Sequence, residues 1–164
     1  MSSWLRHGVD AAATGGATSE EEHLAAVPAT ESDEFGAFSS RTLSLFDHSK
    51  HVRDCAEDFA NRAGLTSSLN RDVTLAGYLH DLGKADPRYQ TYFAGGDPYG
   101  PDSHQVLAKS GERRLPADAW QRAGLPPHWR HEALSVRLAP MLRDFARACD
   151  PMLVLWLVGS HHGY

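Results

Sequence analysis

Apolar side chains recur at gaps of three and four residues over several segments, and this spacing constrains the fold more than any other feature. Between about 42 and 63 it places a run of such residues on one helical face: Leu45, His48, Val52, Cys55 and Phe59. No stretch alternates apolar and polar residues between two turns, as a half-buried strand would. We therefore predict an all-α fold, a compact helical bundle.

Further helices are expected downstream. One begins near Asn70 or Asp72, either of which could be its N-cap, and it is apolar or small on two faces, so it should lie at the centre. Pro140 should kink or divide the helical segment in which it lies. Asp150 and Pro151 fit the N-cap and first position of a last helix, which is apolar all round and should be buried.

Residues 1–40 differ in composition from the rest of the chain. They hold seven acidic residues against Arg6 and show no helical spacing, so we expect an acidic flexible tail or linker. The remaining residues, 41–164, are expected to form one domain. The formal net charge of −5 argues against a generic nucleic-acid binder.

Neither a secretion signal nor a membrane span is visible in the sequence. No basic stretch followed by an apolar run opens the chain, and the longest apolar run, 152–158, is too short to cross a bilayer. We expect a cytoplasmic protein without membrane association. Cys55 and Cys149 are expected to be buried free thiols, with a disulfide as the alternative.

The chain has ten histidines, and four predicted helices carry histidine on or beside the apolar face. These are His48, His80, His131 on the line of Leu134 and Leu138, and the pair His161–His162. A single core histidine is usually satisfied by a backbone carbonyl. Desolvating all of these imidazoles together with Asp81 would cost several kcal/mol without compensation. Metal ligation therefore explains the set better than separate structural roles do.

The adjacent pair His80–Asp81 suggests what such a site could do. Neighbours on a helix point about 100° apart, so the two side chains can flank one metal, or two metals with Asp81 as the bridge. Two cations about 3.5–4 Å apart can clamp a phosphodiester and generate hydroxide near neutral pH. Lys84 follows one turn later, either to contact a phosphate oxygen or as a solvated residue at the end of the helix.

These residues stand in a pattern that resembles a known superfamily. "HDLGK", with "DHSKHV" before it and "RHE" and "SHHG" after it, is similar to the HD superfamily of metal-dependent phosphohydrolases. The longer stretches "LHDLGKADPRYQTYF", "LAKSG", "GLPPHWRHEALS" and "GSHHGY" resemble the HD nuclease of type I CRISPR interference, over about 43–164. The resemblance implies an HD-domain helical bundle with its metal site at the centre.

The resemblance also implies roles for particular residues. One metal would be held by His48, His80 and Asp81, and a second by Asp81, His131, His161 and His162. Lys84 would stabilise charge on the scissile phosphate. The family's pattern includes a further aspartate after the double histidine, and the chain ends at Tyr164, so we expect the domain to be truncated at its C-terminal end.

The expected activity is endonuclease or exonuclease cleavage of single-stranded DNA during CRISPR interference. It would use two divalent metal ions, with manganese, nickel, cobalt, iron or magnesium as the choices the family implies. The expected partners are single-stranded DNA, a superfamily-2 helicase domain, fused or separate, and a CRISPR surveillance complex. Two alternatives stay open: an HD phosphohydrolase acting on small nucleotides, and a non-catalytic helical docking module.

Two groups of side chains could contact DNA. Eight bases lie between residues 105 and 147: Lys109, Arg113, Arg114, Arg122, Arg130, Arg137, Arg143 and Arg147. Some of them could line a groove for single-stranded DNA, and the alternative is that they form solvated faces. The aromatic residues after the His-Asp pair are Tyr89, Tyr92, Phe93 and Tyr99. They could stack on bases or pack in the core.

Overall fold

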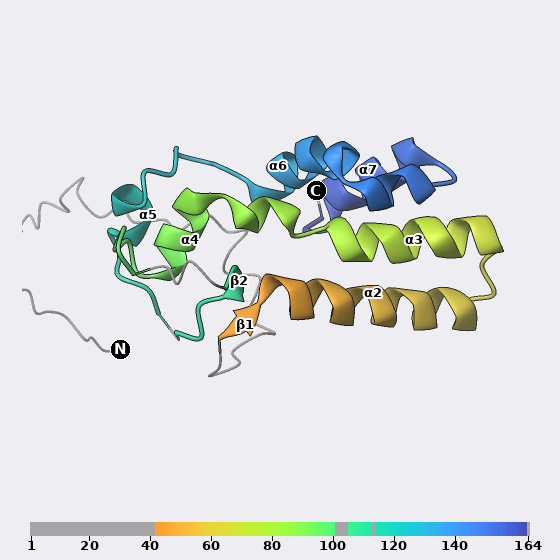
Figure 1. Cartoon of the computed structure of the whole chain (residues 1–164), viewed down its shortest axis with the longest axis horizontal. Helices are drawn as coiled ribbons and strands as arrows, with labels where there is room; N and C mark the ends of the chain where they lie inside the picture. Colours follow the sequence, from red (N-terminus) through yellow and green to blue (C-terminus); the bar gives the residue numbers. More distant parts are fainter. Residues whose placement is uncertain (1–41, 101–104, 113, 164) are drawn as a thin grey trace, which may run out of the picture.

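The computed structural model describes residues 42–100, 105–112 and 114–163, so the predicted tail at 1–40 lies outside the described residues. Within these ranges the helices are α2 (Leu45–Arg62), α3 (Ser67–Leu79), α4 (Pro87–Phe93), α5 (Ala119–Arg122), α6 (His131–Leu138) and α7 (Pro151–Ser160). Short 3-10 helices are η3 (Leu82–Ala85), η4 (Ala139–Met141) and η5 (Arg143–Arg147). The predicted all-α fold is confirmed (Figure 1).

One small departure is an antiparallel pair of strands, β1 (Leu43–Ser44) and β2 (Leu107–Lys109). The prediction that no segment forms a strand is therefore wrong at these two places. Strands of two and three residues are too short to show an alternating pattern, so the sequence carries no periodic signal for them.

The centre of the fold is α3, as predicted. It lies beside α2 in a helical hairpin and packs on its other side against α7 (Figure 1). Gly77 permits the close approach to α2, because a Cβ atom there would lie 3.1 Å from the Cβ of Ala56 and 3.3 Å from the oxygen of Val52. Such contacts are tighter than ordinary packing distances, so a larger residue would push the two helices apart.

The hairpin turn contains one confirmed and one wrong prediction. Gly64, with φ of +68°, ends α2 as expected, because glycine tolerates this left-handed conformation. The N-cap of α3 is Thr66, whose hydroxyl accepts from the N–H of Leu69. The prediction of Asn70 or Asp72 as the cap is therefore wrong, since the helix begins before both residues.

Asp72 instead joins α3 to the start of α7. It is buried, and its carboxylate accepts the backbone N–H of Cys149 at 2.7 Å and that of Asp150 at 2.9 Å. Asp150 in turn caps α7, as predicted, by accepting the N–H groups of Met152 and Leu153. The carboxylates of Asp72 and Asp150 together therefore fix the position at which α7 begins.

Pro140 divides the segment after His131, as predicted: α6 ends at Leu138 and two 3-10 helices follow. The buried face of α6 is not the predicted line through Leu134 and Leu138. It runs instead through His131, Ser135 and Ala139, at gaps of four. Which face is buried was decided by the segment that packs against the helix, η3, and not by hydrophobicity alone.

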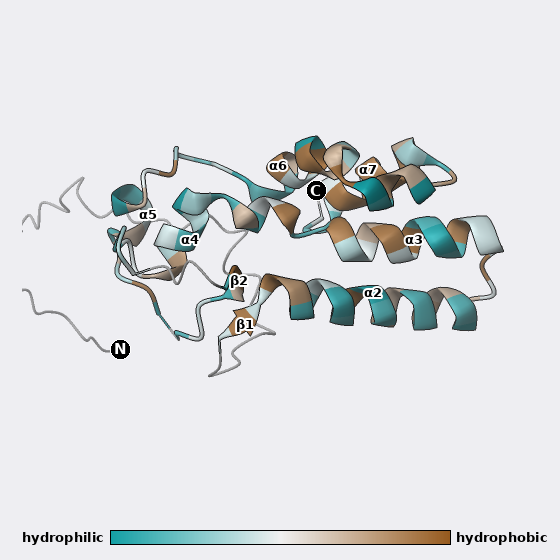
Figure 2. Ribbon diagram, viewed as in Figure 1, coloured by the Kyte–Doolittle hydropathy of each residue, from teal (hydrophilic) through white to brown (hydrophobic). Residues whose placement is uncertain are grey.

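Burial also corrects the predictions for the last helix and for two single residues. The main core consists of Leu75, Ala76, Leu79, Ala139, Val154 and Val158. Figure 2 shows α7 as a largely hydrophobic ribbon. The helix nevertheless contributes only one side to the core, because Met152 and Trp156 are 73% and 67% exposed. Phe59 is exposed on α2, and Cys149 is exposed and free, whereas both were expected to be buried.

A second cluster, rich in aromatic side chains, lies around α4 and α5. These two helices lie at the opposite end of the molecule from the hairpin turn (Figure 1). Tyr89 is at the centre of the cluster and touches Tyr92, Phe93 and Trp129. These contacts support core packing for Tyr89, Tyr92 and Phe93, while Tyr99 is almost fully exposed. Among the described residues, no helix has the length and apolarity needed to span a membrane.

Candidate metal centre

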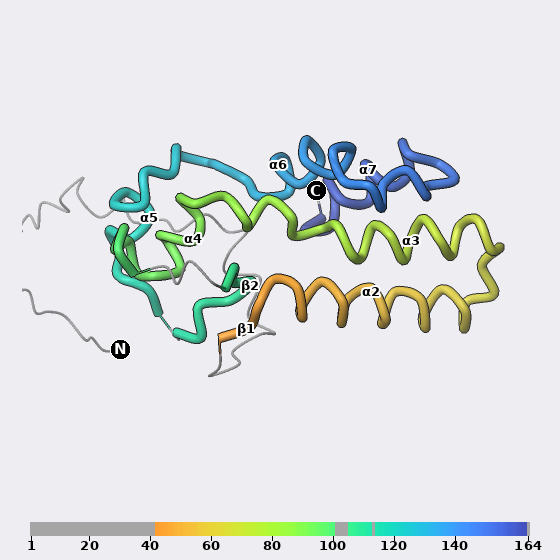
Figure 3. The backbone as a smooth tube through the Cα atoms, in the orientation of Figure 1, coloured from red at the N-terminus to blue at the C-terminus, as the bar shows by residue number. Residues whose placement is uncertain are grey.

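The described chain returns at its C-terminal end to the middle of the molecule, beside the turn that follows α3 (Figure 3). Asp81 lies in this turn with only 2% of its side chain exposed. Its Oδ2 atom lies 3.2 Å from Nε2 of His48 and 3.3 Å from Nε2 of His80. The same oxygen lies 3.0 Å from Nζ of Lys84.

The second oxygen of Asp81 faces a different group of side chains. Oδ1 lies 3.1 Å from Nε2 of His131 and 3.6 Å from Nε2 of His161. The Nε2 atom of His162 completes this side, 3.2 Å from Nε2 of His131. One carboxylate therefore stands between two sets of imidazoles that come from separate parts of the chain.

The local backbone explains how His80 and Asp81 serve one site. The helix α3 ends at Leu79, His80 is its C-cap, and Asp81 has non-helical angles of φ −99° and ψ 9°. The expectation that both residues lie within one helix is therefore wrong. The divergence of about 100° between helical neighbours no longer applies, and the two side chains meet.

The ring orientation of two histidines gives direct information on what the site can hold. Nδ1 of His80 lies 2.8 Å from the carbonyl oxygen of Gly77, and Nδ1 of His161 lies 2.7 Å from that of Val158. A carbonyl oxygen only accepts, so Nδ1 carries the hydrogen and Nε2 of the neutral ring presents a lone pair.

Each of these lone pairs points toward an oxygen of Asp81, which is also an acceptor. Two acceptors facing each other repel unless a cation lies between them. Imidazole nitrogen and carboxylate oxygen are suitable donors for divalent cations such as manganese, nickel, cobalt and iron. The residues present therefore fit a metal centre.

Ionisation favours the same interpretation. Burial by itself raises the pKa of Asp81, but the charge of Lys84 and hydrogen bonds from His131 and His48 outweigh it and hold that pKa well below its usual range. Burial, together with His161 and His131 nearby, lowers the pKa of His162 to about 4. At neutral pH the carboxylate is thus ionised and His162 is neutral, and these are the forms that bind metals.

The predicted site residues fall into two groups in space. The ligand atoms of Asp81, His131, His161 and His162 lie within 4.8 Å of one another, and so do those of His48, His80 and Asp81. All residues predicted as ligands are thus brought together, around the two oxygens of one carboxylate. His51, which lies next to this stripe in the sequence, is exposed and outside both groups.

The position of the Lys84 side chain excludes one of the two roles that the sequence left open for it. Its side chain is 2% exposed and lies against Asp81, so the alternative of a solvated residue at the end of a helix is wrong. Its short 3-10 helix, η3, turns it back toward the carboxylate. Contact with a phosphate stays a prediction for this residue.

Sequence reasoning missed two buried polar residues of α6. Glu132 accepts hydrogen bonds from Arg130, and its Oε2 atom lies 3.5 Å from Nδ1 of His131. Ser135 is fully buried and contacts the turn that carries Asp81. The adjacent letters in "RHE" could have suggested an Arg–Glu pair beside the histidine, but Ser135 carries no such local signal.

Three of the eight bases considered for a DNA groove form ion pairs with acids. The described pairs are Arg122 with Asp118, Arg130 with Glu132, and Arg147 with Asp144. Arg113 lies outside the described residues. These pairs reduce the positive charge that a groove along this segment could offer to phosphates.

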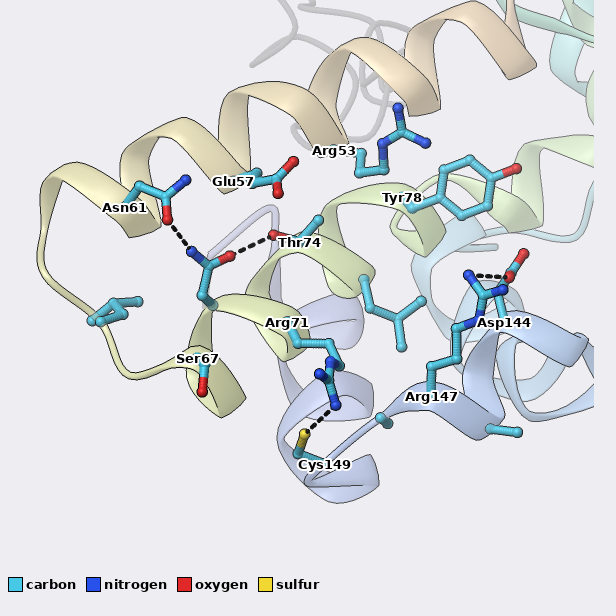
Figure 4. A pocket seen from close by; sticks show the side chains of 15 residues that line it. Arg53, Glu57, Asn61, Ser67, Arg71, Thr74, Tyr78, Asp144, Arg147 and Cys149 are labelled. Atoms are coloured by element: carbon cyan, nitrogen blue, oxygen red, sulfur yellow. Dashed lines mark hydrogen bonds and ion pairs between the residues drawn. The ribbon is translucent and has the colours of Figure 1, made fainter.

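A separate hollow of about 1070 Å³ lies between α2, α3 and the segment around η5 (Figure 4). Arg53, Arg71 and Arg147 line it together with Glu57 and Asp144. Arg53 is also bonded to Asp54 outside the hollow, so opposite charges balance. None of the predicted metal ligands lines this hollow, and its balanced charge gives it no preference for an anion.

The comparison with protein families agrees with this geometry. A family model described as "Cas3, HD domain" matches residues 2–164. No curated protein and no solved structure matches the chain. The matched range includes every residue of the two imidazole groups and the carboxylate between them.

Proposed function

The chain belongs to the Cas3 HD-domain family, and from that premise we propose that it hydrolyses phosphodiester bonds of single-stranded DNA with two divalent cations held around Asp81. Family membership makes it a metal-dependent nuclease domain of CRISPR systems. The observation that supports the two-cation proposal is the division of imidazoles between the two oxygens of Asp81.

The proposed ligands follow that division. His48, His80 and Asp81 would hold one cation, and Asp81, His131, His161 and His162 the other. Divalent cations bound there would polarise the phosphodiester and lower the pKa of a water molecule. We leave the choice among manganese, nickel, cobalt, iron and magnesium as a prediction to be tested, because nitrogen-rich donor sets suit several of these.

The residues of the chain itself have three tasks in this proposal. The backbone carbonyls that bond Nδ1 of His80 and His161 keep each Nε2 atom aimed into the site. The low pKa of Asp81 keeps this carboxylate, which both groups of ligands share, ionised at working pH. Lys84 offsets part of the negative charge on that carboxylate, and we propose that it does the same for the scissile phosphate.

The partners follow from the family. Membership implies association with DNA and with the Cas3 helicase and CRISPR machinery. We propose a superfamily-2 helicase domain, fused or separate, and a CRISPR surveillance complex that presents the displaced strand. A cytoplasmic location stays a prediction.

The test compares Asp81→Asn with the control Asp58→Asn, which removes the charge of an exposed acid on α2. A 5′-labelled single-stranded oligonucleotide is incubated with manganese, with and without a chelator. We expect Asp81→Asn to lose cleavage by more than about 100-fold, since even outer-shell changes cost 10–100-fold at metal sites. The control should cleave like the wild type. Unchanged cleavage by a folded Asp81→Asn variant would exclude the proposal.

The same assay distinguishes the two alternatives. Hydrolysis of cyclic dinucleotides without cleavage of DNA would favour a phosphohydrolase for small nucleotides. A wild type that binds no metal and cleaves neither substrate would favour the docking module. Elemental analysis of the purified protein separates these outcomes before any substrate is added.

A further inference from the structure

We propose that Ser135 is a positioning residue that sets the spacing between Asp81 and His131, and so controls the cation on the His131 side. This inference rests on the proposed function, in which these two residues share a metal ion. It concerns a side chain that touches neither the ligand atoms nor the solvent, since Ser135 is 0% exposed.

The hydroxyl of Ser135 connects the backbones of the two segments that carry these ligands. The N–H of Gly83, two residues after Asp81, donates to Oγ of Ser135 at 2.8 Å. Oγ then donates to the carbonyl oxygen of His131 at 3.0 Å. One buried hydroxyl thus uses both its donor and an acceptor position to hold η3 against the first turn of α6.

The two backbones approach so closely that no side chain fits between them. A Cβ atom at Gly83 would lie 2.0 Å from the carbonyl oxygen of His131 and 3.0 Å from the backbone nitrogen of Ser135. Contacts below 3.0 Å require something to shift. The distance of 3.1 Å between Oδ1 of Asp81 and Nε2 of His131 depends on this approach.

The other side of η3 is held independently by Gln90. Its amide nitrogen donates to the carbonyl oxygens of Lys84 at 2.6 Å and Leu107 at 2.9 Å, and its oxygen accepts the N–H of Leu107 at 2.8 Å. Loss of the Ser135 hydroxyl should therefore loosen the turn toward α6 and leave its attachment to β2 intact. The two cations should respond unequally.

The experiment is manganese titration of folded wild type and Ser135→Ala, by calorimetry and by electron paramagnetic resonance of the coupled ion pair. We expect the affinity of one ion to fall by about 10–100-fold, the range for outer-shell changes, with the other ion unaffected. Hydrogen exchange of the Gly83 amide should accelerate in the variant, because its buried acceptor is gone.

Ser160→Ala is a matched control. Its hydroxyl donates to the carbonyl oxygen of Trp156 at 2.8 Å, the same bond within a helix, and within the described residues it has no hydrogen bond to another element. We expect both manganese affinities to be unchanged. Equal losses in the two variants would overturn the inference, because the bond within the helix would then explain the effect.

Ser135→Thr keeps the hydroxyl and serves if the alanine variant does not fold. We expect it to bind the second ion more tightly than Ser135→Ala, or to fold where alanine does not. A folded Ser135→Ala that binds two ions like the wild type overturns this inference alone. A wild type that binds no manganese overturns the proposed function, and the two failures are thus distinguishable.

Discussion

The buried carboxylate of Asp72 allows a quantitative prediction of how a substitution changes the free energy of unfolding. This carboxylate accepts two backbone N–H groups, from Cys149 and Asp150, at 2.7 and 2.9 Å. Hydrogen bonds to a charged group contribute about 1.5–3 kcal/mol each. Cys149 and Asp150 are exposed, so water can replace part of what is lost, and we expect Asp72→Ala to lower the free energy of unfolding by about 3 kcal/mol.

Asp150→Ala is the comparison that isolates burial. Asp150 also accepts two backbone N–H groups, both at 3.0 Å, but at an exposed helix N-terminus. Removal of such a cap costs about 1 kcal/mol. Urea unfolding of both variants, followed by circular dichroism, should therefore show a difference of about 2 kcal/mol, the gap between these two expectations.

The isosteric variant Asp72→Asn makes the test stricter. The amide keeps one acceptor oxygen and turns an N–H₂ group toward a backbone N–H, so we expect a loss close to that of alanine. If Asp72→Ala and Asp150→Ala cost the same, the link between α3 and α7 is no stronger than an ordinary cap, and the reasoning fails.

Three further predictions concern the site. Gly83→Ala should reduce DNA cleavage in a gel assay, because the added Cβ would meet the carbonyl of His131. We expect a loss of about 100-fold, the cost of displacing a group of the site by about 1 Å. The control Gly159→Ala, whose Cβ would meet only a side-chain methyl of Val136 at 3.2 Å, should stay active in the same assay. His48→Gln should weaken manganese binding in calorimetry, whereas His51→Gln, on the exposed side of the same helix, should bind as the wild type does; equal losses would contradict the assigned ligands. The pKa of His162 in the folded protein is about 4, below the ordinary 6.5. Between these two pH values the unfolded chain binds a proton at His162 that the folded protein does not bind. The metal-free protein should therefore lose stability in urea as pH falls from 6.5 toward 4, and His162→Gln should flatten this slope; a slope unchanged in the variant would refute the assignment.

Features that depend on near neighbours along the chain could be predicted from the sequence. Spacing of three and four residues predicted the helices, Gly64 and Pro140 predicted where they end or break, and Asp150 predicted the last cap. These signals are local, since a cap or a breaker acts on the backbone within one turn. The histidines on apolar faces also indicated that imidazoles would be buried, because a helix of a globular domain typically packs its apolar stripe against the core.

Which distant side chains contact one another could not be predicted from the sequence and follows from the packing of the folded chain. Asp72 finds its partner 77 residues away, and Ser135 finds Gly83 at a separation of 52, so neither contact leaves a pattern within a helical turn. The exposed side of α7 and the buried line of α6 depend on which neighbours cover each helix, and hydropathy does not specify them. Helical spacing indicates that a face is buried, but the element that covers this face depends on how the whole chain packs. The position of the Asp81 carboxylate between two groups of imidazoles depends on the same packing.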